Sequence, residues 1–197
     1  MADKREGVTM CGRYYFDVLK SKRLQKLVNL LEKAGINVKT GEVFPNDVTA
    51  VINASHQKTQ LSGIKWGLDG FRENQLIINA RAESVTDKKM FRTPFLTNRC
   101  LFPMSGFYEW NPAKDKFYFT YPDDQLIFVG GFIRNEQDGS RSIIMTTEPN
   151  QNVSPIHNRM PVLIGEKDIK QGLFDNDFAR GWIQHRMPAL SVTKVPK

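Results

Sequence analysis

Apolar and polar residues follow two different rhythms along the chain, and the change between them lies near residue 35. Before it, apolar residues recur at helical spacing from Leu24 to Ala34, and Gly35 is a natural helix end. After it, short β-prone runs bounded by turn residues follow one another at 48–53, 75–79, 116–121, 126–132 and 142–147. Weaker helical patterns are found at 84–91, 166–174 and 177–184.

The domain organisation follows from the same pattern, because no repeat, low-complexity tract or linker interrupts it. We expect an α+β fold in a single domain, mainly antiparallel β in a barrel-like sheet, with a few peripheral helices. The 197 residues can bury a sizeable core without a disulfide or a metal. We expect residues 1–10 to be a detachable extension or tag, 11–190 to be the domain, and 191–197 to be a loose tail.

Charge is the feature of the composition that bears most on function. The formal net charge is +7 and the pI is about 9.4, which favours a polyanionic partner such as nucleic acid. A basic composition of the host's proteins would give the same values. No apolar run is long enough to span a bilayer, and the first ten residues lack the apolar core of a signal peptide. We therefore expect a cytoplasmic protein, nucleoid-associated in a bacterium, with no membrane partner.

Two cysteines, Cys11 and Cys100, are expected to be free thiols in an intracellular setting. With three histidines and no Cys-x-x-Cys pair, we expect neither a metal nor a cofactor. Cys11 is followed by Gly12 and Arg13, and a positive charge next to a thiol lowers its pKa and makes it reactive. A small buried apolar residue is the alternative. Met10 directly before Cys11 favours the reactive thiol, because a start at Met10 followed by methionine removal would make Cys11 the first residue.

Three further segments carry polar residues that fit either chemistry or structure. Asn79 and Glu83 follow an apolar strand, where they would build a site or cap a helix. Glu109 lies among three aromatics, as a carboxyl group suited to acid/base work or as an ordinary strand residue. His157 lies between two prolines in an expected loop, as a proton carrier or as a structural histidine. The residues alone leave each pair of alternatives open.

Several of these segments, in this order, resemble the SOS response-associated peptidase (SRAP) family over nearly the whole chain. The resemblance rests on Met-Cys-Gly-Arg-Tyr at 10–14, Trp-Gly-Leu at 66–68 and Asn-Ala-Arg-Ala-Glu at 79–83. It continues with Arg-Cys at 99–100, Gly-Phe-Tyr-Glu-Trp at 106–110, Thr-Thr at 146–147 and Ile-His-Asn-Arg-Met-Pro at 156–161. Residues 11–190 are thus identified as an SRAP-like domain.

The resemblance implies a protein that cross-links covalently to abasic sites in single-stranded DNA and shields the lesion. The amine and thiol of a mature N-terminal Cys11 would form a Schiff base and then a thiazolidine. Asn79 would orient Cys11 or the product, and Glu109 and His157 would carry protons. The resemblance implies DNA contacts for Arg13, Trp66, Arg81, Arg99, Thr147 and Arg159.

Three departures from the family pattern accompany the resemblance. Cys11 is internal in this sequence, so residues 1–10 must be absent, added or removed by the protein itself. Residues 69–72 read Asp-Gly-Phe-Arg in place of the usual proline and second tryptophan, and Asn98 replaces an arginine. Two other functions remain open: a cysteine peptidase that acts on other proteins, and a non-catalytic module that binds single-strand or junction DNA. We expect a monomer in each case.

Overall fold

The computed structural model describes residues 12–70, 75–123 and 125–196. The expectations for Cys11 and for the extension at 1–10 therefore lie outside the described residues. None of the helices in these three ranges is long and apolar enough to cross a membrane.

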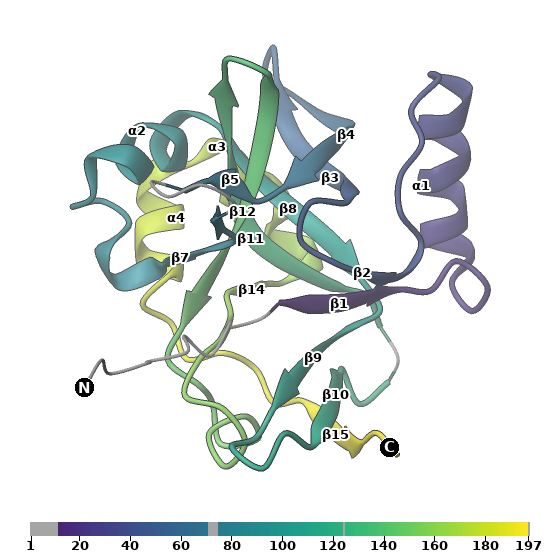
Figure 1. Cartoon of the computed structure of the whole chain (residues 1–197). Helices are drawn as coiled ribbons and strands as arrows, with labels where there is room; N and C mark the ends of the chain where they lie inside the picture. The colour runs from purple at the N-terminus through teal and green to yellow at the C-terminus, as the bar shows by residue number, and fades with distance from the viewer. Residues whose placement is uncertain (1–11, 71–74, 124, 197) are drawn as a thin grey trace.

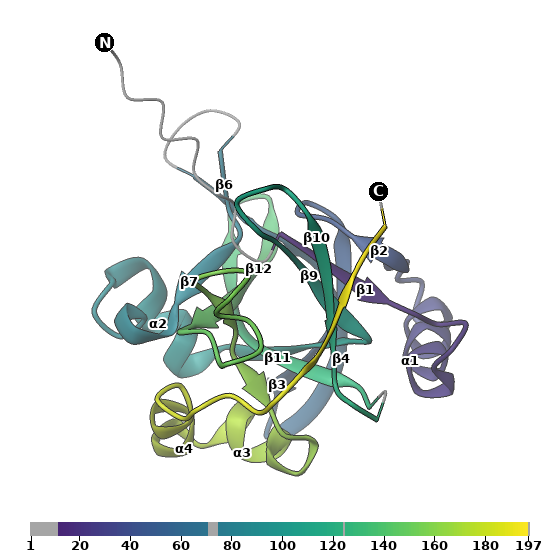
Figure 2. The same cartoon turned by 90° about the horizontal axis from the view of Figure 1, so that it is seen from below.

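Five strands close into a barrel at the centre of the molecule. They are β3 (Val48–Ser55), β4 (Lys58–Trp66), β8 (Arg99–Met104), β11 (Ile127–Glu136) and β12 (Gly139–Thr147). The neighbours are β12–β4, β4–β3, β3–β8, β8–β11 and β11–β12, and only the β12–β4 pair is parallel. Figure 2 shows these strands around a common centre. The prediction of a mainly antiparallel, barrel-like α+β fold is confirmed.

A second sheet continues from the barrel, because β8 runs on through Ser105 into β9 (Gly106–Trp110). Its order is β15 (Ser191–Lys194), β10 (Lys116–Thr120), β9, β1 (Arg13–Phe16) and β2 (Gly41–Val43), all antiparallel. The expectation of a loose tail at 191–197 is wrong for β15, which pairs with β10 from Ser191 opposite Thr120 to Lys194 opposite Phe117. These backbone hydrogen bonds hold the end of the chain along the sheet edge.

Short strands complete the β-structure: β7 (Asn79–Arg81), β13 (Met160–Pro161) and β14 (Leu163–Ile164) add to the barrel sheet, and β5 (Leu68–Asp69) and β6 (Leu76–Ile77) form a separate pair. β14 pairs with β11. The two that matter most here lie on β12: β7 runs parallel to it, and β13 runs antiparallel at its end.

The helices lie outside the barrel on opposite sides, with α1 (Lys22–Lys33) apart from the others (Figure 1). The predicted first helix is confirmed: Ser21 caps α1, which buries Leu24, Val28 and Leu31. The other side carries η1 (Ala82–Ser84), α2 (Lys89–Thr97), η2 (Glu166–Asp168), α3 (Ile169–Phe174) and α4 (Asn176–Trp182). The helix expected at 84–91 overlaps the observed helices only at its two ends, because η1 stops at Ser84 and α2 begins at Lys89 and continues through Pro94. Burial of Phe91 and Phe95, one turn apart, offsets the hydrogen bond that Pro94 removes.

Candidate functional site

The centre of the candidate site is a buried pair formed by Glu109 and His157. Strand alternation turns Phe107 and Glu109 of β9 inward and leaves Tyr108 and Trp110 half-buried. His157 comes from the segment between β12 and β13, far away in the sequence. Its Nδ1 lies 3.8 Å from Oε2 of Glu109, and the two residues are only 7% and 1% exposed. An imidazole at this distance from a buried carboxyl group can transfer a proton to it, or accept one from it, after a small movement of either side chain.

The His157 ring is oriented by the backbone of Arg159. Its Nδ1 lies 3.2 Å from the Arg159 amide N–H, which can donate to it, and 3.1 Å from the Arg159 carbonyl oxygen, which can accept from it. Which of these bonds forms depends on the tautomer of the ring. The preceding turn is also hydrogen-bonded, because the His157 N–H donates to the carbonyl of Val153 and Asn150 Oδ1 accepts from Val153. The ring is therefore attached to an ordered segment.

An ion pair between Arg159 and Glu83 lies next to this segment. The Arg159 guanidinium donates to both oxygens of Glu83, at 3.0 and 2.7 Å, and to the carbonyl of Thr146 at 2.7 Å. The Thr147 hydroxyl donates to Glu83 at 3.3 Å. Partial burial alone would raise the pKa of Glu83, but its hydrogen bonds and the Arg159 charge hold it below its ordinary value. Glu83 follows β7 on η1, so the pair joins three segments: η1, the end of β12 and the start of β13.

Strand pairing places two more predicted residues along the same edge. Asn79 and Arg81 of β7 lie opposite Ile144 and Thr146 of β12. Asn79 is half-buried and Arg81 is exposed, whereas Ala80 between them is buried in the core. The structure therefore brings Asn79, Arg81 and Thr147 to neighbouring strands, with Arg81 exposed to solvent. Arg159 lies directly before the next strand, β13.

Arg13 lies on the outward face of the second sheet, opposite Tyr108 in the β1–β9 register. Its guanidinium is 4.6 Å from the centre of the Phe44 ring and 5.2 Å from that of Trp110, and it lies 3.4 Å from Glu42. Lys116 also pairs with Glu42, at 2.6 Å. Burial alone would raise the pKa of Glu42, and these two cations bring it below its ordinary value. No local pattern pointed to Glu42 or Lys116, because Arg13, Glu42 and Lys116 lie on three separate strands, β1, β2 and β10.

Two predicted DNA contacts are corrected by their burial. Trp66 is fully buried in the core, where its indole N–H donates to the carbonyl of Ile78, so it cannot stack on a base. Arg99 is 5% exposed, and its guanidinium forms hydrogen bonds within the protein, so it is not accessible to a phosphate. Its partners are the carbonyls of Phe95, Leu96, Gly172 and Leu173 and the side chain of Asn176. It ties the end of α2 to α3 and α4.

The other cysteine, Cys100, is fully buried on β8, and burial raises the pKa of its thiol far above the ordinary value. A thiol in this state is a poor nucleophile. Among the residues that the structure describes, no group of three or more histidine, cysteine or acidic side chains could hold a metal ion.

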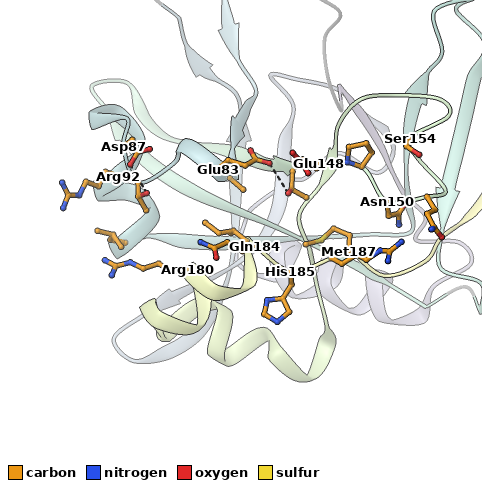
Figure 3. A pocket seen from close by; sticks show the side chains of 18 residues that line it. Glu83, Asp87, Arg92, Glu148, Asn150, Ser154, Arg180, Gln184, His185 and Met187 are labelled. Carbon is orange, nitrogen blue, oxygen red and sulfur yellow. Dashed lines mark hydrogen bonds between the residues drawn. The ribbon is translucent and has the colours of Figure 1, made fainter.

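An open cleft of about 1080 Å³ begins where Glu83 and Thr147 meet and extends between α2, α4 and the segment after β12 (Figure 3). Its walls are mainly polar. Arg92 and Arg180 lie toward one end, and neither forms an ion pair with any residue in the described ranges. The cleft gives the candidate site a surface on which an extended ligand could continue.

The structure is thus a small α+β protein built on a closed five-stranded barrel, with a buried Glu–His pair beside an Arg–Glu ion pair. The family model described as SOS response associated peptidase (SRAP) matches residues 10–187, and the chain belongs to this family. The resemblance inferred from the motifs is therefore confirmed.

Relatives agree with this assignment, and solved structures agree with the fold. The chain is 27% identical to abasic site processing protein YoqW of Bacillus subtilis (strain 168), covering 89% of this chain and 87% of the relative. It is 29% identical to YoaM of the same organism, covering 70% of this chain and 66% of the relative. A crystal structure of a Bordetella bronchiseptica protein matches with a TM-score of 0.73 at 17% identity, covering 95% of this chain and 100% of the other. At that identity the structural match bears on the fold alone.

Proposed function

We propose that this protein processes abasic sites in DNA, as the names of its relatives describe for them. More specifically, we propose that Cys11, once it is the first residue, cross-links covalently to abasic sites in single-stranded DNA and so shields the lesion. The observation that carries the proposal is the buried Glu109–His157 pair, which lies beside the end of the strand that leads to Cys11.

The register of β1 and β9 supports this arrangement. Arg13 lies opposite Tyr108, and Glu109 is the next residue of β9. Two residues of extended chain cover about 7 Å at most, so covalent connection through Gly12 limits how far Cys11 can be from this strand end. Glu109 and His157 are thereby candidates to act on groups attached to Cys11.

The chemistry depends on an amine and a thiol on the same residue. The α-amine of Cys11 attacks the aldehyde carbon of the ring-opened sugar, and loss of one water gives a Schiff base. The Cys11 thiol then adds to the imine carbon, and its proton passes to the nitrogen, which closes a thiazolidine ring. An α-amine has a pKa of roughly 7.7, so a fair fraction is already a neutral nucleophile near neutral pH. The second step is intramolecular, which raises its effective concentration strongly.

The remaining predicted residues take roles that fit where they lie. We assign proton transfer during sugar opening and water loss to Glu109, with His157 as a second proton carrier. Asn79 would orient Cys11 or the product. Arg13 and the exposed Arg81 would hold phosphates of the strand, which makes binding tolerant of base sequence and sensitive to salt.

The amine of Cys11 exists only after the Met10–Cys11 peptide bond is gone. We propose that the protein removes the preceding residues itself. The Cys11 thiol attacks the carbonyl carbon of Met10, the C–N bond breaks as the acyl group moves to sulfur, and the nitrogen takes up a proton to become the free amine. Water then hydrolyses the thioester, which releases residues 1–10 with a C-terminal carboxylate and restores the thiol. The full chain would then show the mass of residues 11–197 after incubation, and a Cys11→Ala variant would keep the full mass.

A denaturing gel tests the cross-link. Protein that starts at Cys11 is incubated with a single-stranded oligonucleotide that carries one abasic site, then heated and separated. We expect a heat-stable band of the combined mass, which is lost in Cys11→Ala and retained in the matched variant Cys100→Ala. Absence of the band with folded wild-type protein would contradict the proposal. Binding without a cross-link would favour a non-catalytic DNA-binding module, and cleavage of added proteins would favour a peptidase.

A further inference from the structure

The resemblance to the family implies a DNA contact for Arg159, and in the structure its guanidinium contacts other residues of the protein. The side chain is 11% exposed, and its partners are both oxygens of Glu83 and the carbonyl of Thr146. A bidentate contact of this kind fixes the direction of both side chains as well as their distance. Arg81 and Arg13, in contrast, are accessible to a phosphate.

The backbone of the same residue is the immediate neighbour of the His157 ring. Both its N–H and its carbonyl lie within hydrogen-bond distance of His157 Nδ1, on the side of the ring that faces Glu109. Any shift of the Arg159 backbone therefore changes the orientation of the ring. Pairing of Met160 with Thr147 holds the chain after Arg159, and the hydrogen-bonded turn from Asn150 to His157 holds the chain before it. The Arg159 side chain adds an anchor between these two, at the residue whose backbone contacts the ring.

Glu83 completes the connection from another part of the fold. It lies on η1, immediately after β7, and the Thr147 hydroxyl of β12 holds the oxygen that also accepts from Arg159 Nη1. Loss of the Glu83 charge would leave a mostly buried guanidinium without its counter-ion, and the segment would have to move to solvate it.

We propose that Glu83 is a positioning residue, which acts through Arg159 to hold the His157 ring in line with Glu109. Arg159 serves this positioning through its backbone and its ion pair with Glu83. The proposal rests on the proposed function in one respect, namely that His157 carries a proton in the cross-linking reaction.

Glu83→Gln tests this, because it keeps the shape of the side chain and removes its charge. The matched control is Glu166→Gln, which removes the charge from a comparable bidentate pair with Arg23, at 2.8 and 2.5 Å, on an exposed surface. A displacement near 1 Å at a reacting group costs up to about 100-fold in rate. We expect the single-turnover cross-linking rate at saturating DNA to fall roughly 10- to 100-fold in Glu83→Gln and to be unchanged in Glu166→Gln. Glu83→Asp, which keeps the charge, should restore part of the rate.

A second measurement does not depend on the reaction. The ring ¹⁵N resonances of His157 report its tautomer and hydrogen bonds. They should change in Glu83→Gln and not in Glu166→Gln, with Glu83→Asp intermediate. If the wild-type protein forms no cross-link, the proposed function fails, and these resonances still decide whether Glu83 positions the ring.

Two results would overturn the proposal. One is a Glu83→Gln protein with unchanged His157 resonances and an unchanged rate. The other is an unchanged rate at saturating DNA together with a change of more than about threefold in affinity for intact single-stranded DNA. In that case Glu83 would control DNA binding by Arg159 and not the orientation of the His157 ring. If Glu83→Gln does not fold, the same measurements on Glu83→Asp and on Thr147→Val, which removes one hydrogen bond to Glu83, decide the matter.

Discussion

Replacement of Arg99 by methionine separates a structural role from a DNA-binding role at one position. Methionine retains an apolar stem of similar length and removes the five hydrogen bonds of the guanidinium. Each such bond contributes on the order of 1 kcal/mol net, and four buried backbone carbonyls lose a donor. Water can reach some of them, since α2 and α3 lie at the surface, so the contributions do not add fully. We expect a loss of about 3–5 kcal/mol in the free energy of unfolding.

This loss can be measured by thermal and urea unfolding followed by circular dichroism. For a chain of this length, 1 kcal/mol corresponds to roughly 2–4 °C, so Arg99→Met should lower the Tm by roughly 10 °C. Affinity for single-stranded DNA, measured well below the Tm, should stay within about twofold of wild type, because the guanidinium is not on the surface. Arg81→Met is the matched control, with weaker DNA binding and an unchanged Tm. A Tm within about 2 °C of wild type, or a large loss of DNA affinity in Arg99→Met, would refute the reasoning.

Three further predictions address other parts of the molecule. Glu42→Gln should tighten binding of single-stranded DNA about two- to threefold at low salt and steepen its salt dependence, because Lys116 loses its counter-ion. The pKa of Glu83 is lowered in the folded protein, so its pairing with Arg159 stabilises the fold at pH values above the unfolded-state pKa. This stabilisation is lost as the pH falls through the folded-state pKa, and Glu83→Gln should therefore flatten the acid side of a curve of unfolding free energy against pH. Removal of 191–197 should lower the Tm and promote aggregation, measured by light scattering, because it exposes the β10 edge.

Much of the fold could be predicted from local pattern. The first helix has apolar spacing, a Ser cap and a terminal Gly, and the strand runs at 48–53 and 142–147 lie within β3 and β12. The tail could not be predicted in this way, because the four residues of β15 become a strand only through the partner edge that β10 offers. The extent of α2 could not be predicted in this way either, since burial of Phe91 and Phe95 outweighs the helix-breaking tendency of Pro94.

The candidate site was predictable in its residue types and less so in their roles. Glu109 and His157 are more than forty residues apart, and the family motifs imply proton transfer for both. In the structure His157 Nδ1 lies 3.8 Å from Glu109 Oε2. Trp66 and Arg99 belong to equally distinctive motifs, yet they are core residues, because a motif does not reveal which face of a strand its side chains occupy. The partnership of Glu83 with Arg159 depends on strand pairing between β7, β12 and β13, which no local pattern encodes.

The mass of the cross-linked peptide tests the central claim most directly. Trypsin cleaves after Arg13, so protein cross-linked to an abasic oligonucleotide and then digested should carry residues 11–13 on the DNA. A thiazolidine requires the summed mass of this peptide and the abasic DNA less one water, and the adduct should not gain hydrogen on treatment with borohydride. An adduct that begins upstream of Cys11, an adduct on a lysine peptide, or a gain of two hydrogens with borohydride would contradict the account.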